Sequence, residues 1–176
     1  MSNNYKDHIP TIEDFPVKGI SFKDTTGLLE DPAIFESVIT DMCATIEKGS
    51  ATHIVGIESR GFLFGCVMAS RLKLPFVPIR KKGKLPRPTV QQSYSLEYGE
   101  AVIELTKGIL GSESRVIIVD DLLATGGTFK AAATLCEKEG AQVVKFVTVV
   151  ELPALGGRKN LEPYEVTSLI SYDDVL

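Results

Sequence analysis

A run of thirteen residues, Val116–Thr128, holds the side chains best suited to chemistry in this 176-residue chain. It reads VIIVDDLLATGGT, a β-branched stretch followed by two adjacent acids and a loop of small residues. Glycines in such a loop let backbone N–H groups approach an anion, and a helix that begins there adds partial positive charge. We therefore predict that this loop binds a phosphate group through Ala124, Thr125, Gly126, Gly127 and Thr128.

The two acids, Asp120 and Asp121, do not bind phosphate themselves, because ionised carboxylates only accept hydrogen bonds. Beside a phosphate site they suit the hydroxyl groups of a sugar that carries the phosphate, or a cation next to it. The combination predicts a sugar-phosphate site in which the acids orient the pentose. The alternative is an ordinary strand-to-helix turn that has a capping threonine and binds nothing.

Other motifs for phosphate binding or nucleophilic catalysis do not match the spacing. The chain has neither G-x-x-x-x-G-K-[ST] nor G-x-G-x-x-G, and it has no G-x-S-x-G nucleophile elbow. A sugar-phosphate phosphatase that begins with a strand and D-x-D is a further alternative, but the acids of this chain are adjacent.

Cations gather in a second segment, where five of them fall within eight residues: Arg80, Lys81, Lys82, Lys84 and Arg87. A solvated face or an RNA-binding patch would have the same composition. The segment follows a predicted strand and is interrupted by glycine and proline, which favours a mobile loop that closes over a polyphosphate. Arg60 also follows a predicted strand, where it either caps a helix on the surface or binds the same anion.

The order of the predicted elements places these segments at one edge of a sheet. Strands are expected at 53–57, 76–80, 115–119 and 142–151, and helices at 32–48, 61–72 and 128–139. Such an alternation builds an α/β fold, an open, mostly parallel, twisted sheet with helices on both faces. Ligands bind there beyond the carboxyl ends of the strands, which makes 58–61, 81–93 and 120–128 the candidate segments.

The composition indicates one folded domain over residues 1–176, because 44% of the residues are hydrophobic and one core serves roughly 100–200 residues. The net charge of −4 argues against broad nucleic-acid binding. No apolar run is long enough for a membrane span or resembles a signal peptide, so a cytoplasmic protein is expected. Three cysteines without a C-x-x-C pair predict free, mostly packed thiols.

The pattern as a whole resembles the type I phosphoribosyltransferases, and among them the members that act on adenine. Residues 116–128 are similar to the motif with which this family binds phosphoribosyl pyrophosphate. Further matches follow in the same order along nearly the whole chain, at 14–24, 58–65, 79–86, 93–99 and 150–158. Two positions depart from the family pattern, which commonly has Asp where Glu58 stands and Arg where Lys23 stands.

The resemblance implies a purine-salvage reaction, in which adenine and 5-phosphoribosyl-1-pyrophosphate give AMP and pyrophosphate. It also implies a small N-terminal hood over the purine at 1–30 and a flexible catalytic loop at 81–98. Mg²⁺ is expected to arrive with the pyrophosphate rather than in a protein cage, and a homodimer is expected.

The resemblance implies the following roles for single residues. Glu97 is the carboxylate that handles the proton of the attacking base. Arg60, Arg80, Lys81 and Lys84 meet the pyrophosphate. Backbone groups of Ser21 and Lys23 recognise adenine, and Leu122 covers the base from below. Independently of the resemblance, Phe22 is expected to pack in the core, because it lies in an irregular apolar segment.

Two alternative functions stay open at this point. One is a phosphoribosyltransferase for another purine base, because hypoxanthine, guanine and xanthine differ from adenine only around the ring edge. The other is a nucleotide-sensing regulator on the same fold. Such a regulator needs a DNA-binding segment, whereas the residues before the first predicted helix are acidic and contain proline rather than a helix-turn-helix pattern.

Overall fold

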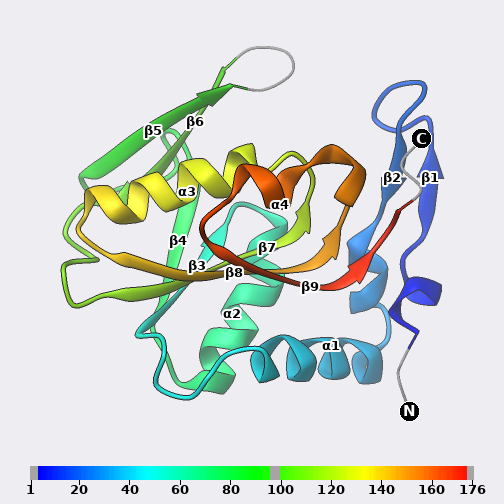
Figure 1. Cartoon of the computed structure of the whole chain (residues 1–176), viewed down its shortest axis with the longest axis horizontal. Helices are drawn as coiled ribbons and strands as arrows, with labels where there is room; N and C mark the ends of the chain where they lie inside the picture. Colours follow the sequence, from blue (N-terminus) through cyan, green and yellow to red (C-terminus); the bar gives the residue numbers. More distant parts are fainter. Residues whose placement is uncertain (1–3, 96–99, 174–176) are drawn as a thin grey trace.

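The computed structural model describes residues 4–95 and 100–173 and has a seven-stranded sheet at its centre (Figure 1). The strand order is β5-β6-β4-β3-β7-β8-β9. Strands β4, β3, β7, β8 and β9 are parallel, whereas β6 and β5 extend the sheet in antiparallel fashion. The strands are β3 His53–Ile57, β4 Phe76–Lys81, β5 Thr89–Ser95, β6 Glu100–Thr106, β7 Arg115–Leu123, β8 Gln142–Glu151 and β9 Glu165–Ser171. The predicted single α/β domain with a mostly parallel sheet is confirmed.

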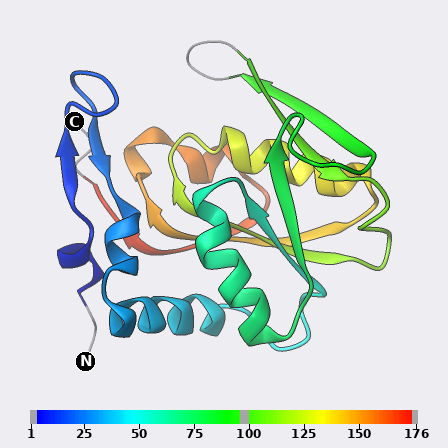
Figure 2. The same ribbon diagram turned by 180° about the vertical axis from the view of Figure 1, so that it is seen from behind.

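Helices cover both faces of the sheet (Figures 1 and 2). Helices α1 (Pro32–Ala44) and α2 (Arg60–Leu72) lie on one face, and α3 (Gly127–Lys138) and the short α4 (Gly157–Asn160) lie on the other. Along the central strands, Ile54 and Ile117 pack in the core beneath α1 and α2, whereas Val55 and Ile118 pack in the core beneath α3. Burial on both faces explains why these strands are continuous β-branched runs in the sequence.

Most predicted elements are confirmed, with shifts at their ends. Strands β3 and β8 have the predicted bounds, and α1 begins at Pro32, where the carboxylate of Asp31 accepts the N–H of Ala33 at 2.8 Å. Helix α1 ends at Ala44 instead of residue 48, because the N–H and hydroxyl of Thr45 both donate to the carbonyl of Met42.

Strand β7 differs from its prediction in a way that affects the site. It runs to Leu123 rather than to residue 119, because its last residues continue to pair with β8, Asp120 with Thr148 and Leu122 with Val150. The two acids therefore belong to the strand instead of following it. Successive strand residues point to opposite faces, so the two carboxylates have different surroundings.

The segment predicted as a loop at 81–93 is only partly one. Thr89–Ser95 forms strand β5, because it pairs along its whole length with β6. The connection from β4 to β5 is the turn 82–88, which is called the basic turn below. Glu97, the predicted proton-handling residue, lies outside the described residues.

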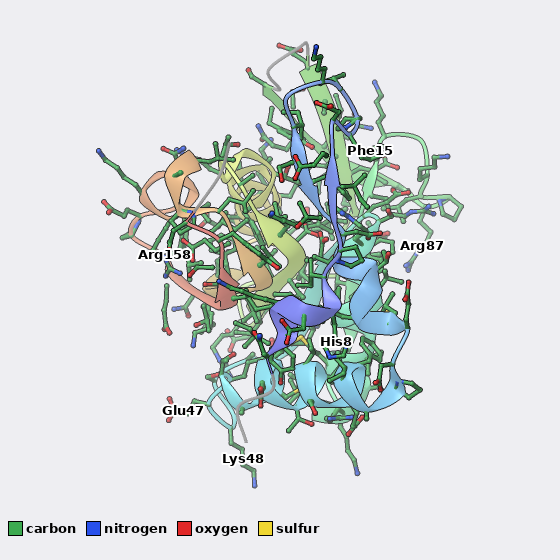
Figure 3. All side chains as sticks on the ribbon, turned by 90° about the vertical axis from the view of Figure 1, so that its right-hand side faces the viewer. His8, Phe15, Glu47, Lys48, Arg87 and Arg158 are labelled. Carbon is green, nitrogen blue, oxygen red and sulfur yellow. The ribbon has the colours of Figure 1, made fainter. Side chains whose placement is uncertain are left out.

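The hood stands beside the sheet as a separate small layer at the right of Figure 1. It contains the short 3-10 helices η1 (Tyr5–His8) and η2 (Thr25–Leu29) and the antiparallel pair β1 (Thr11–Glu13) and β2 (Ser21–Lys23). Figure 3 looks at the hood from outside, with Phe15 at the far end of the hairpin and His8 near α1. Among the described residues, no helix is long and apolar enough to cross a membrane.

Candidate functional site

A pocket of about 230 Å³ opens where β7 ends and α3 begins. It lies at the carboxyl edge of the parallel strands, as the fold class predicts. The loop of small residues, both acids, Leu122 and the arginine at the start of α2 all contribute to it. The lining residues are Arg60, Asp120, Asp121, Leu122, Ala124, Thr125, Gly126, Gly127, Thr128 and Phe129. All of them except Phe129 are predicted site residues, so the structure brings this part of the prediction together in one place.

The phosphate loop, residues 124–128, has the backbone that an anion site requires. Gly126 is the N-cap of α3 and has a φ of +84°, a left-handed conformation that favours glycine. The N–H groups in the first turn of a helix have no acceptor within the helix. Gly126 has no side chain that could cap them, so they remain available to an anion in the pocket.

Helix α4 supports the phosphate loop on the side away from the pocket. A Cβ on Gly157 would lie 2.2 Å from the carbonyl oxygen of Ala124, so the two backbones are in direct contact. Nδ2 of Asn160 donates to the carbonyl of Thr125 at 2.8 Å. The C=O and N–H of a trans peptide point in opposite directions. Directing these two carbonyls at α4 therefore directs the N–H groups of Thr125 and Gly126 away from it.

An ion pair between Arg158 and the buried carboxylate of Glu151 holds α4 in place. Nε of Arg158 donates to Oε1 of Glu151 at 2.9 Å, and the same guanidinium donates to the carbonyl of Val166 on β9. Ser168 donates to the second oxygen of Glu151 at 2.7 Å. The hydrogen bonds from Arg158 lower the pKa of the Glu151 carboxyl, against the smaller effect of its burial. The phosphate loop thus rests on a helix that is itself anchored to two strands.

The acids differ in surroundings and therefore in role. Asp121 is 3% exposed, and its Oδ2 accepts the hydroxyl of Thr25 at 2.5 Å and lies 3.2 Å from Nε of Arg60. Asp120 also lines the pocket, and its Oδ1 accepts the N–H of Asp121 at 2.9 Å. Burial, and then the neighbouring Asp121 carboxylate, raise the pKa of Asp120 well above its ordinary value. Asp121 is thus paired with Arg60, whereas the carboxyl of Asp120 is bonded to the backbone of its neighbour.

The hood reaches the pocket through β2. The Phe22 ring lies 5.0 Å from the guanidinium carbon of Arg60 and is partly exposed, so the prediction that Phe22 packs in the core is wrong. In an antiparallel pair, residues bonded to the partner strand alternate with residues whose N–H and C=O point outward. The N–H of Asp24 donates to the carbonyl of Pro10, so Asp24, and with it Phe22 two residues earlier, is hydrogen-bonded to β1. Ser21 and Lys23 therefore present backbone groups along the free edge of β2.

The predicted pyrophosphate-binding cations separate into two groups. Arg60 lines the pocket, whereas Arg80, Lys81 and Lys84 lie at the end of β4 and in the basic turn, outside the lining. Arg80 is paired with Glu58, to which it donates from Nη2 at 3.1 Å and from Nε at 3.3 Å. Strands β3 and β4 are parallel neighbours, so the basic turn follows the same sheet edge as the pocket.

Sequence reasoning missed several residues that shape the site. Thr25 and Phe22 carry no signal in a single sequence, because their partners Asp121 and Arg60 are distant in the chain. The adjacent glycines at 156 and 157 do indicate a close backbone approach, although not to which segment.

Comparisons with known proteins agree with this geometry. Residues 25–175 match the model of the phosphoribosyl transferase domain family. The adenine phosphoribosyltransferase of Carboxydothermus hydrogenoformans is 48% identical over 167 residues, which are 95% of this chain and 98% of that protein.

Solved structures give the same result. That of adenine phosphoribosyltransferase from Thermoanaerobacter pseudethanolicus has a TM-score of 0.92 at 46% identity, with 95% of this chain and 97% of that chain covered. That of the Trypanosoma brucei enzyme, in complex with AMP, pyrophosphate and ribose-5-phosphate, has a TM-score of 0.85 at 26% identity, with 95% and 77% covered. The chain therefore belongs to the adenine phosphoribosyltransferase family.

Proposed function

We propose that this chain transfers the 5-phosphoribosyl group of 5-phospho-α-D-ribose 1-diphosphate to adenine, with AMP and diphosphate as products. The observation that carries the proposal is the pocket in which an uncapped helix N-terminus, a carboxylate and an arginine face one another. These groups match, in order, the 5′-phosphate, the ribose hydroxyls and the diphosphate of one substrate.

The phosphate loop holds the 5′-phosphate through the N–H groups of Gly127 and its neighbours, which fixes one end of the substrate. Asp120 accepts hydrogen bonds from the ribose hydroxyls. Cleavage of the bond from C1 to diphosphate builds positive charge on the sugar and negative charge on the leaving group. Arg60, oriented by Asp121, stabilises the leaving diphosphate. Arg80, Lys81 and Lys84 add positive charge from the neighbouring turn.

Adenine is recognised by the free edge of β2. The N6 amino group of adenine is a donor and N1 is an acceptor, so one carbonyl and one N–H of Ser21 and Lys23 complement it. A 6-oxo purine has the reverse pattern and would leave both backbone groups unpaired, which disfavours it strongly. Leu122 lines the pocket beside the acids and supplies an apolar surface for the ring.

Mg²⁺ belongs to the proposal as a companion of the diphosphate. Within residues 4–95 and 100–173 no group of three or more metal-ligating side chains is found, and a metal bound mainly through phosphate oxygens needs only one or two carboxylates. Asp120 fits that need. When bound, the ion neutralises charge on the departing diphosphate. Glu97 is proposed to receive or relay the proton that adenine loses.

A homodimer and a cytoplasmic location complete the proposal, both on the strength of the family. Leu63 on α2 is 39% exposed and is an apolar side chain that a subunit interface would cover. Light scattering coupled to size exclusion gives the mass in solution, and a monomer at micromolar concentration would contradict the dimer.

The function is tested by measuring diphosphate release with adenine, hypoxanthine, guanine and xanthine, with and without Mg²⁺. Adenine is expected to be preferred and Mg²⁺ to be required. The Asp120→Asn and Asp121→Asn variants are compared at equal folded fraction, set by their melting curves. AMP formation within a few-fold of wild type in the double variant would refute the ribose role. Loss of turnover in Glu97→Gln at unchanged melting temperature supports the proton role.

A further inference from the structure

Glu104 is a buried carboxylate that has no part in the site described so far. It is 2% exposed and lies in β6 between Ile103 and Leu105, two residues of the core beneath α3. Burying a charge in such a position is unfavourable unless hydrogen bonds compensate it. Among the described residues, the salt bridges do not include Glu104. Its compensation comes from another source.

The partners of Glu104 come mainly from the basic turn and the start of β5. Oε1 accepts the backbone N–H groups of Lys84 and Leu85, each at 3.0 Å. Oε2 accepts from the hydroxyl of Thr89 and the amide of Gln91, each at 3.3 Å. Burial alone would raise the pKa of Glu104, but these hydrogen bonds, chiefly from backbone amides of the turn, lower it below its ordinary value. The buried carboxylate therefore binds two backbone amides of the turn and two side chains of β5 at once.

The register of the sheet explains why Glu104 can do this. It pairs with Arg80 of β4 on one side and with Gln91 of β5 on the other. The basic turn joins these two strands, so its backbone passes the carboxylate. Nη1 of Arg80 donates to the carbonyl of Lys84 at 3.1 Å, so both backbone groups of Lys84 are bonded.

A second carboxylate fixes the beginning of the same turn. Glu58, which follows β3, accepts the N–H of Lys81 at 2.8 Å and hydrogen bonds from Nε and Nη2 of Arg80. Glu58 stands two residues before Arg60 of the pocket. The basic turn is thus tied through Glu58 to the segment that carries Arg60 and through Glu104 to β6.

We propose that Glu104 is a positioning residue that holds the basic turn where the ammonium group of Lys84 contacts the diphosphate of the substrate. This inference rests on the proposed function. A fixed backbone at Lys84 lowers the conformational entropy lost when its side chain binds the anion, which strengthens binding. Glu104 acts on the diphosphate alone, because the 5′-phosphate is held by the phosphate loop on the other side of the pocket.

The experiment compares the affinity for diphosphate with that for AMP, which has the 5′-phosphate but no diphosphate. Glu104→Ala is expected to weaken binding of Mg-diphosphate and to raise the KM for the diphosphate substrate about tenfold, because the backbone N–H of Lys84 loses its acceptor and the binding side chain must then be ordered on binding. The Kd for AMP is expected to stay within about twofold of wild type. Glu104→Gln keeps one carbonyl acceptor for the two amides but lacks the charge and the second oxygen, so it should recover only part of the diphosphate affinity.

A matched control and a double-mutant cycle make the test specific. Glu139 also accepts a backbone N–H, from Gly108 in the turn after β6, so Glu139→Ala should leave both affinities unchanged. In a Lys84→Ala background, Glu104→Gln should cause no further loss of diphosphate affinity, since it acts through Lys84. This cycle decides the question even if Glu104→Ala does not fold.

Three results would overturn the inference. The first is wild-type diphosphate affinity in Glu104→Ala. The second is an equal loss of AMP and diphosphate affinity, which indicates a general loss of structure. The third is additive effects of Glu104→Gln and Lys84→Ala on diphosphate affinity. The activity of the wild-type protein is measured before any variant is made. If it makes no AMP from adenine, the proposed function is wrong, and this outcome is distinct from a failure of the inference about Glu104.

Discussion

Among the described glycines, Gly157 is the position where the Cβ of an alanine would make the closest contact. A Cβ at this position would lie 2.2 Å from the carbonyl oxygen of Ala124 and 2.8 Å from Cδ1 of Leu123. Real Cβ atoms essentially never come closer than 3.0 Å to another heavy atom, so the carbonyl of Ala124 must move by about 0.8 Å. The obstacle is backbone, which cannot rotate away as a flexible side chain does.

The displacement acts on stability and on phosphate binding by different amounts. Overpacking of this kind typically costs about 1–3 kcal/mol of folding free energy. Moving the phosphate loop by nearly 1 Å also misaligns its N–H groups, and misplacements of that size reduce activity by about 100-fold. We expect Gly157→Ala to unfold at lower urea concentration and to bind AMP at least about tenfold more weakly, a loss of roughly 1.4 kcal/mol.

The measurements are urea denaturation and calorimetric titration with AMP, each with a control variant. Gly111→Ala is the matched control, because its φ is ordinary and a Cβ there meets nothing within 4 Å. It should keep the AMP affinity of wild type. An AMP affinity within twofold of wild type in Gly157→Ala would refute the idea that α4 determines the shape of the phosphate loop.

Three further predictions concern other parts of the chain. Asn160→Ala removes one hydrogen bond to the phosphate loop, which is worth about 0.5–1.5 kcal/mol, so this variant should bind AMP about 2- to 12-fold more weakly than wild type. The control variant Lys159→Ala should bind AMP as wild type does. An equal loss of AMP affinity in both variants would contradict the prediction. Folding lowers the pKa of Glu104, so the ionised carboxylate stabilises the fold above the ordinary pKa of 4.5, and this stabilisation is lost as the pH falls through the lower pKa of the folded state. Urea midpoints measured from pH 7 to pH 3 should therefore fall more steeply for wild type than for Glu104→Gln. Parallel curves for the two proteins would contradict this prediction. Burial raises the pKa of Cys136 to about 12, so its thiol is protonated and inaccessible at pH 8. A thiol reagent should therefore modify the exposed Cys66 in the folded protein and Cys136 only after unfolding. Rapid labelling of Cys136 in the folded protein would contradict its burial.

The parallel core of the fold could be predicted because each of its strands has a recognisable pattern in its own segment of the sequence. His53–Ile57 and Gln142–Glu151 are β-branched runs bounded by polar or glycine residues, and both have the predicted bounds. Strands β5 and β9 could not be predicted in the same way. Residues 89–95 alternate between partly buried and exposed side chains and have few large apolar residues, so only the pairing with β6 reveals the strand.

The candidate site likewise has a part that the sequence predicts and a part that it does not. The phosphate loop and the acids are contiguous in the sequence, so their spacing alone indicates a sugar phosphate. Contacts that orient them join residues far apart in the chain, such as Thr25 with Asp121 and Asn160 with Thr125. A single sequence contains no signal for such pairs. Glu104 is the extreme case, because a charged residue in a half-polar strand is ordinarily expected on the surface.

The dependence of the phosphate loop on α4 has a consequence for synthesis on the ribosome. Residues 124–128 leave the exit tunnel well before Gly157 and Asn160, and before β9, to which Arg158 is bonded. A nascent chain that ends at α3 has the loop but nothing to shape it. We therefore expect nucleotide binding to begin only when α4 and β9 have emerged, and truncations ahead of residue 157 to lack it.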